Sequence, residues 1–155
     1  MADSTHKSIL DAVQIGVQAL DLTGIVDAAV HVGWGILENP KNFPAVFICA
    51  AGTESVVGGT NGSDDIAYPV ALYFAARHPL EKLDYIDTAL YARQRIRKKF
   101  ISQRLLTVVP TATGVSTVHS CRLEGSPILE PNILRLFQML VTPLAFQFIS
   151  RETRG

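Results

Sequence analysis

Apolar and polar positions recur along the chain with two different periods, and the first of these predicts a helix near the start. Five apolar residues lie there at helical spacing: Ile9, Leu10, Val13, Val17 and Leu20. Their intervals of one, three, four and three residues place them on a single stripe. Ser4 or Thr5 is a suitable cap before that stripe, and Gly24 is a suitable stop after it. We therefore predict a leading helix between these signals.

The clearest helical pattern follows Pro79 and runs through Leu105. Its apolar stripe consists of Ile86, Leu90, Ile96 and Phe100. Asp84 and Asp87 occupy the early turns, and basic residues crowd the later ones: Arg93, Arg95, Arg97, Lys98, Lys99 and Arg104. Because the helix dipole favours acidic groups at its start and basic groups at its end, this polarity supports one long helix. Phe100 is expected in the core.

Shorter apolar or alternating runs predict strands at residues 28–32, 45–50, 66–75, 115–123 and 139–150. Runs 45–50 and 66–75 are expected to pair as an antiparallel hairpin. The connection between them, residues 52–65, is rich in glycine and predicts a long, flexible loop. Pro69 and Pro143 fall inside predicted strands. Because proline cannot donate to the hydrogen-bond ladder, each should lie at a sheet edge or at a bulge.

The order helix, strands, long helix, strands predicts an α+β fold. We expect an antiparallel or mixed sheet of about four to five strands, with the leading helix and the long helix packed on one face. A length of 155 residues fits a single domain spanning residues 1–155. The composition, 48% hydrophobic and 18% charged, excludes a disordered chain.

Charge and cysteine content narrow the classes of protein to which this chain could belong. The 14 Lys and Arg residues balance 14 Asp and Glu residues, which argues against a globally basic nucleic-acid binder. Cys49 and Cys121 are too few for a disulfide framework and indicate a reducing compartment. The start of the chain lacks the pattern of a secretory signal. The apolar runs are also shorter than the ~20 residues of a membrane span. We expect a soluble protein that is made inside the cell.

Residues with chemical potential are scattered. His6, His31, His78 and His119 have no helical His or Cys partner at metal-ligand spacing, so no metal site is predicted. Cys49 lies in an apolar run, where burial makes a thiol inert. The glycine-rich residues 58–63 are followed by two aspartates instead of the Lys of a phosphate loop. The sequence therefore predicts no catalytic residue, metal or cofactor.

Two charged groups remain without a chemical role. Asp64 and Asp65 lie in the predicted loop, and Arg93, Arg97 and Lys98 lie in the later part of the long helix. Both groups fit an ordinary solvated surface. They also fit a complementary pair of surfaces, and our hypothesis is that these five residues make contacts between protomers.

Four segments in this order resemble those of a known family: the leading helix SILDAVQIGVQAL, the return strand IAYPVALYFAAR, the long helix YIDTALYARQRIRKKFI and the closing strand TPLAFQFISRE. The chain resembles the tail terminators and related neck proteins of tailed bacteriophages, the small proteins of the head–tail joint. The resemblance covers nearly the whole chain through its pattern of elements and does not depend on an invariant motif.

The resemblance implies a structural protein of the virion, assembled in the host cytoplasm, without catalytic residues or cofactors. Such proteins form rings, commonly hexamers, that cap the tail tube and dock to the head connector or stopper. The expected partners are therefore copies of the chain, the tail tube protein and the connector or stopper. No membrane partner is expected, and DNA would be met only as it passes through the lumen. The residues leave two alternatives open: a ligand-binding or regulatory module that dimerises, and a small metal-assisted hydrolase using the loop carboxylates with His78 or His119.

Overall fold

The computed structural model describes residues 4–33, 44–77, 83–102, 106–107, 117–128 and 139–154. These residues form a mixed sheet with helices, which confirms the predicted α+β class. The expected four to five strands only roughly match the seven strands of the described sheet. None of the described helices is long and apolar enough to cross a membrane.

The helices are α1 (Thr5–Gln18), the short 3₁₀ helix η1 (Asp27–Ala29) and α2 (Leu83–Ser102). The strands are β1 (Val30–Gly33), β2 (Ala45–Cys49), β3 (Ser55–Thr60), β4 (Ser63–Arg77), β5 (Leu106–Thr107), β6 (Thr117–Glu124) and β7 (Met139–Thr153). The described α2 occupies the interior of the predicted helix at 79–105, whose two ends lie outside the described residues.

Helix α1 begins at the predicted cap. The side chain of Ser4 accepts a hydrogen bond from the backbone nitrogen of Lys7 at 3.2 Å, which satisfies one of the free amides of the first turn. The helix ends at Gln18, before the predicted stop at Gly24. The chain leaves the helix early because Asp21 adopts a positive φ of 47°, after which Leu22 is buried in the core.

Two long strands form the centre of the sheet. β4 and β7 pair antiparallel over their whole length, from Ser63 opposite Thr153 to Arg77 opposite Met139. On the free side of β4, one half pairs with β2 and the other half pairs with β3. On the free side of β7 lies β6, followed by β5. The predicted antiparallel pairing of residues 45–50 with 66–75 is confirmed, and the parallel strand β1 makes the sheet mixed.

Both prolines lie in internal strands, at positions where the strand has a neighbour on one side. Pro69 of β4 falls between the residues that pair with β2 and those that pair with β3, and its carbonyl accepts a hydrogen bond from His6. Pro143 of β7 lies beyond the last pair with β6, and its carbonyl accepts one from Arg93. The prediction of an edge strand or a bulge is therefore wrong for both prolines, because β4 and β7 are the central strands and their mutual register is unbroken at Pro69 and Pro143. A side chain completes the hydrogen bonding where a strand could not.

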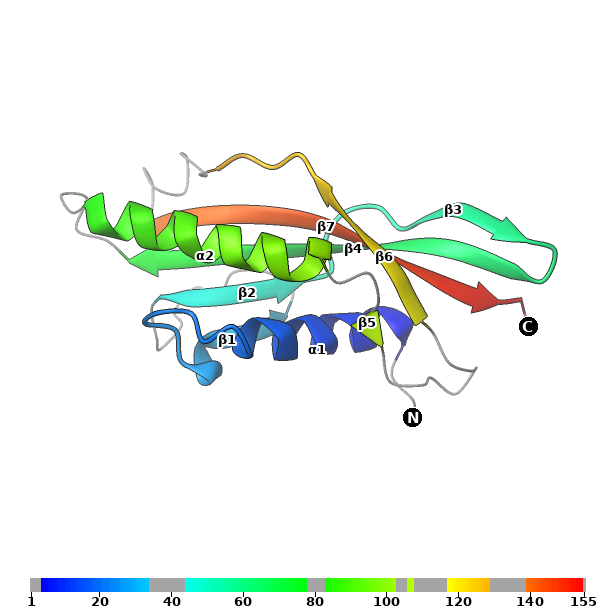
Figure 1. The fold of residues 1–155 in the computed structure, drawn as a ribbon, viewed down its shortest axis with the longest axis horizontal. Coiled ribbons are helices and arrows are strands. Elements are labelled where there is room, and N and C mark those ends of the chain that lie inside the picture. Colours follow the sequence, from blue (N-terminus) through cyan, green and yellow to red (C-terminus); the bar gives the residue numbers. More distant parts are fainter. Residues whose placement is uncertain are drawn as a thin grey trace.

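Both helices pack on one face of the sheet, with α1 over β1 and β2 and α2 over β4, β7 and β6 (Figure 1). Phe100 is confirmed as a core residue, with 1% of its surface exposed. Its ring meets the edges of the Phe146 and Phe148 rings, each with centroids 5.8 Å away. Gly16 of α1 allows this packing, because a Cβ there would lie 3.1 Å from the Phe100 ring.

The prediction of a long flexible loop at residues 52–65 is wrong for most of that segment. Residues 55–60 form β3, and residues 63–65 are the first part of β4. Together with the end of β7 they extend beyond both helices (Figure 1). We call this projection the arm, defined as residues 55–67 and 149–153. The segment forms strands because β7 is long enough to support β4 to its first residue.

Candidate assembly interface

The outer strand of the arm is exposed along its whole length. All six residues of β3 are exposed, including Val56 at 66% and Val57 at 43%. β3 pairs with β4 on one side, and the described residues supply no strand on its other side. Its sequence, SVVGGT, contains neither charge nor proline. Charged residues and proline are the residue types with which proteins ordinarily prevent an edge strand from pairing with another chain, and β3 has none of them.

Small residues keep the tip of this hairpin narrow. The pairing of β3 with β4 shifts register between Val56 and Gly58, so Val57 is the additional residue of a bulge. A Cβ on Gly59 would lie 2.6 Å from the carbonyl oxygen of Ser63, too close for any other residue type without movement. At the turn, the hydroxyls of Thr60 and Ser63 are hydrogen-bonded at 2.8 Å.

Two ion pairs join β4 to the end of β7. Asp65 accepts two hydrogen bonds from Arg151, and Asp64 accepts two from Arg154, from Nε at 3.0 Å and from Nη2 at 2.6 Å. These hydrogen bonds hold the pKa of each carboxyl below its ordinary value of 3.8, against a smaller opposing effect of desolvation. Asp64 and Asp65, predicted as contacts between protomers, are thus engaged within the chain. The pairing of β4 with β7 brings the two arginines to them.

A bulge in β6 brings His119 to the same place. The register of β6 on β7 shifts between Val118 and Ser120, which leaves His119 as the additional residue. Its Nε2 lies 3.4 Å from Oδ1 of Asp65, longer than a usual hydrogen bond. Three strands therefore converge on one carboxylate. Because the pKa of Asp65 is lowered, this carboxylate is a weak proton acceptor at neutral pH and fits a structural role better than a catalytic one.

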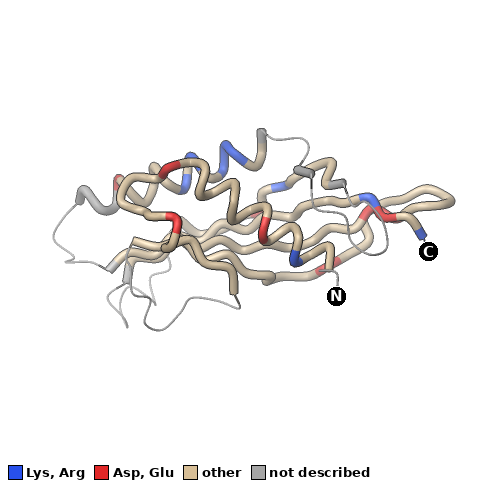
Figure 2. The backbone as a smooth tube through the Cα atoms, turned by 90° about the horizontal axis from the view of Figure 1, so that it is seen from below, with Lys and Arg blue, Asp and Glu red and all other residues tan. Residues whose placement is uncertain are grey.

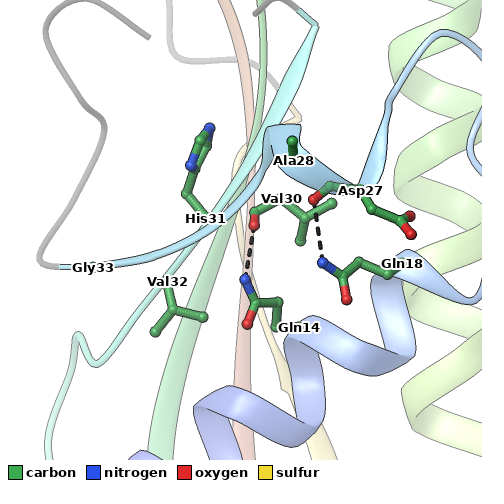
Figure 3. A pocket seen from close by; sticks show the side chains of 8 residues that line it. All are labelled: Gln14, Gln18, Asp27, Ala28, Val30, His31, Val32 and Gly33. Carbon is green, nitrogen blue, oxygen red and sulfur yellow. Dashed lines mark hydrogen bonds between the residues drawn. The ribbon is translucent and has the colours of Figure 1, made fainter. Parts of the chain in front are cut away.

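The edge at β1 differs from the edge at β3, because helix α1 protects it. The side-chain amide of Gln14 donates to the carbonyl of Val30 at 2.9 Å, and that of Gln18 donates to the carbonyl of Asp27 at 3.1 Å (Figure 3). The backbone nitrogen of Val30 in turn donates to the Asp27 carbonyl. Side chains of α1 thus occupy one carbonyl at the start of β1 and one just before the strand. Beside them lies an open pocket of about 510 Å³, lined by these residues and by His31 and Gly33.

The three predicted basic contacts separate in the structure. Arg93 is partly buried and donates to the carbonyls of Pro143 and Ser126 and to the hydroxyl of Thr142. Burial lowers the pKa of Arg93, and the nearby charge of Arg97 adds to that effect. Arg97 and Lys98 are exposed on the outer side of α2, where Leu90, Tyr91 and Ile101 are exposed as well. Arg93 thus stabilises the fold, while Arg97 and Lys98 remain surface residues.

The described side chains form no other chemical cluster. Within the described ranges, no group of three or more His, Cys, Asp or Glu residues could hold a metal ion. Burial raises the pKa of the Cys49 thiol and raises that of Cys121 to about 12, so both thiols are protonated at neutral pH. His78 of the hydrolase alternative lies outside the described residues.

Comparison with known proteins gives this chain no relative: no family model matches its sequence, and no curated protein is significantly similar to it.

Sequence reasoning missed the partners that organise the arm. Arg151 and Arg154 follow the last predicted strand, and nothing in their spacing marks them as partners of residues 64 and 65. Only the extension of β4 and β7 to their full lengths brings these four side chains together. The sequence of β3 offers only two adjacent valines as a strand signal, and the two glycines beside them favour a turn when read alone.

Proposed function

We propose that the protein is a structural component of the head–tail joint of a tailed bacteriophage. In this role, copies of the chain form a closed ring that caps the tail tube and offers a docking face to the head connector or stopper. The ring is the central element of the proposal. The tube and connector are partners carried over from the family that the sequence resembles.

The observation that carries the proposal is the contrast between two edges of one sheet. At the β1 edge, Gln14 bonds the carbonyl of Val30 and Gln18 that of Asp27 just before the strand, whereas β3 is exposed, uncharged and carries two exposed valines at the end of the arm. A protein that works alone protects such a strand, because unpaired backbone groups and apolar side chains recruit other chains. An edge left open beside a protected one therefore supports assembly.

Two further features support a structural role over a chemical one. The carboxylates of the arm are neutralised by arginines of the same chain, which leaves them unsuited to acid–base work. A ring also requires head-to-tail contacts between two different surfaces of each subunit, and the β3 side and the β6 side of this sheet are different in sequence and charge.

Mass measurement and negative-stain microscopy of the purified protein test this proposal. We expect closed rings from the wild type. The double variant Val56→Lys/Val57→Lys should be monomeric, because lysines on an edge strand oppose pairing. The matched control is Val26→Lys, at a valine that is 58% exposed outside the arm, which should still form rings. A wild-type protein that stays monomeric at every concentration would overturn the proposal, and a dimer would favour the regulatory-module alternative.

A further inference from the structure

The arm half of the sheet has two different edges, β3 on one side and β6 on the other. The strands there follow the order β3, β4, β7, β6, and each pair is antiparallel. Strand directions therefore alternate across this half. When copies are related by rotation, as in a ring, β6 of one copy approaches β3 of the next in the antiparallel direction. The alternation then continues from copy to copy without interruption.

The two edges are matched in length. β5 pairs with Val118 and Thr117 at the start of β6, and residues 119–124 have no described strand on their outer side. These six residues equal the six residues of β3. A full-length pairing of the two segments sets Ser55 opposite Glu124 and Thr60 opposite His119.

This register also brings together two exposed apolar side chains on the same face. Val56 is paired with Ile66, and Leu123 is paired with Phe146, so both lie on the face that the helices cover. Val56 is 66% exposed and Leu123 is 36% exposed. In the register above they are directly opposite, where a cross-strand apolar pair removes both from water. A register shifted by one residue would place them on opposite faces.

The register implies a stagger between copies. Within one chain, a row of directly paired residues crosses the four strands: Ser55 is opposite Ala67, Ala67 is opposite Ile149, and Ile149 is opposite Ser120. Between copies Ser55 meets Glu124, which is four residues further along (124 − 120 = 4). Closing a sheet into a ring requires tilted strands and a repeated stagger of this kind, so the offset agrees with closure.

Charge near the two edges is mixed. The exposed residue Glu54, just before β3, is acidic, and β6 carries the exposed residues Arg122 and Glu124, of opposite charge. Figure 2 shows basic residues in the later turns of α2, whereas α1 carries both a basic and an acidic residue, the ion pair of Lys7 with Asp11. A contact between β3 and β6 therefore depends on backbone groups and apolar side chains.

We infer that β3 of one copy pairs antiparallel with β6 of the next copy, with Val56 opposite Leu123, and that this contact repeats head to tail. The inference rests on the proposed ring and specifies the two surfaces that build it. The strand that completes β3 thus belongs to a second copy of this chain.

Disulfide trapping tests the contact directly. In a Cys121→Ser background, the pair Val56→Cys/Leu123→Cys is introduced and the protein is oxidised mildly. Within one chain these two positions are separated by three strand spacings, about 14 Å across the sheet, and also by several residues along the strands, because Val56 lies in the row of Val118. A disulfide needs Cα atoms within about 7 Å, so a bond can form only between copies. We expect a ladder of covalent multimers, up to the ring size, on a non-reducing gel.

The matched control is Ser55→Cys/Leu123→Cys in the same background, because Ser55 lies on the opposite face of β3 from Val56. It should remain monomeric on the gel. A multimeric protein in which the Val56/Leu123 pair gives no ladder, or gives no more than the Ser55/Leu123 pair, would overturn this contact while leaving the ring intact. A protein that is monomeric in solution would overturn the ring itself and the contact with it.

Discussion

Arg151 holds Asp65 through two parallel hydrogen bonds, Nε to Oδ1 at 2.8 Å and Nη2 to Oδ2 at 2.9 Å. The two residues are directly opposite each other on β7 and β4, so this fork fixes the arm at the point where it leaves the helices behind. In the proposed ring, an arm held in this way would lose less conformational entropy when a second copy binds.

The contribution of this pair to stability depends on pH in a defined direction. The hydrogen bond from Arg151 lowers the pKa of Asp65 in the folded chain below its ordinary 3.8. The pair's contribution is thus fully present above pH 3.8 and is lost as the pH falls through the lower folded pKa. We expect Asp65→Asn to lower the thermal midpoint at neutral pH, and the difference from wild type to vanish in strong acid. A difference that persists unchanged in acid would contradict this role.

Phe100 is the aromatic centre of the contact between α2 and the sheet. Its ring is 1% exposed and packs edge-on against Phe146 and Phe148. We expect Phe100→Ala to lower the free energy of unfolding by about 3–5 kcal/mol, because a large buried ring leaves a cavity. Denaturant melts measure this value. Ile101→Ala, at a neighbouring residue that is 45% exposed, is the control and should have little effect. A loss below about 1 kcal/mol for Phe100→Ala would contradict the packing.

Arg93 connects α2 to the sheet beside Pro143, where β7 pairs with β4 but has no described strand on its other side. Its guanidinium donates to several oxygens at once, including the Pro143 carbonyl and the Thr142 hydroxyl. A lysine keeps the charge but cannot reproduce this planar fork. We expect Arg93→Lys to cost about 1–3 kcal/mol of unfolding free energy. The same change at the exposed Arg97 should cost almost nothing. Equal losses of unfolding free energy at both positions would contradict the stabilising role of the Arg93 hydrogen bonds.

Arg97 and Lys98 are expected to contribute to assembly. Reversing both to glutamate removes the basic character of the outer side of α2 and should weaken a contact with an acidic surface of another subunit. Sedimentation at low salt should then show smaller particles than the wild type forms. Wild-type assembly should weaken as salt is raised, since exposed charges are screened. An unchanged particle mass at low salt would refute this role.

The sequence predicted those parts of the fold that depend on local pattern. The stripe of α1, its Ser4 cap and the core position of Phe100 were all readable, because helical spacing and capping are local properties. The antiparallel pairing of residues 45–50 with 66–75 was also predicted, because both runs are rich in apolar and aromatic residues and follow each other along the chain. The prediction that each proline marks an edge strand or a bulge is wrong: both lie in central strands, where one side of the strand lacks a pairing partner among the described residues.

The arm could not be predicted, because its strands depend on distant partners. Residues 55–65 are rich in glycine and aspartate, which favour turns when read alone. They become strands because β7 continues to Thr153 and supplies Arg151 and Arg154 to the two aspartates. The interpretation of Asp64 and Asp65 as free surface groups could not anticipate this, since the partners lie at the far end of the chain.

The mass of the purified wild-type particle, measured across a range of concentrations, tests the central claim most directly. The account predicts one discrete multimer of at least three copies, seen as a closed ring by microscopy and lost when Val56 and Val57 are both replaced by lysine. A particle with the mass of a single chain, 16.9 kDa, at every concentration would contradict it.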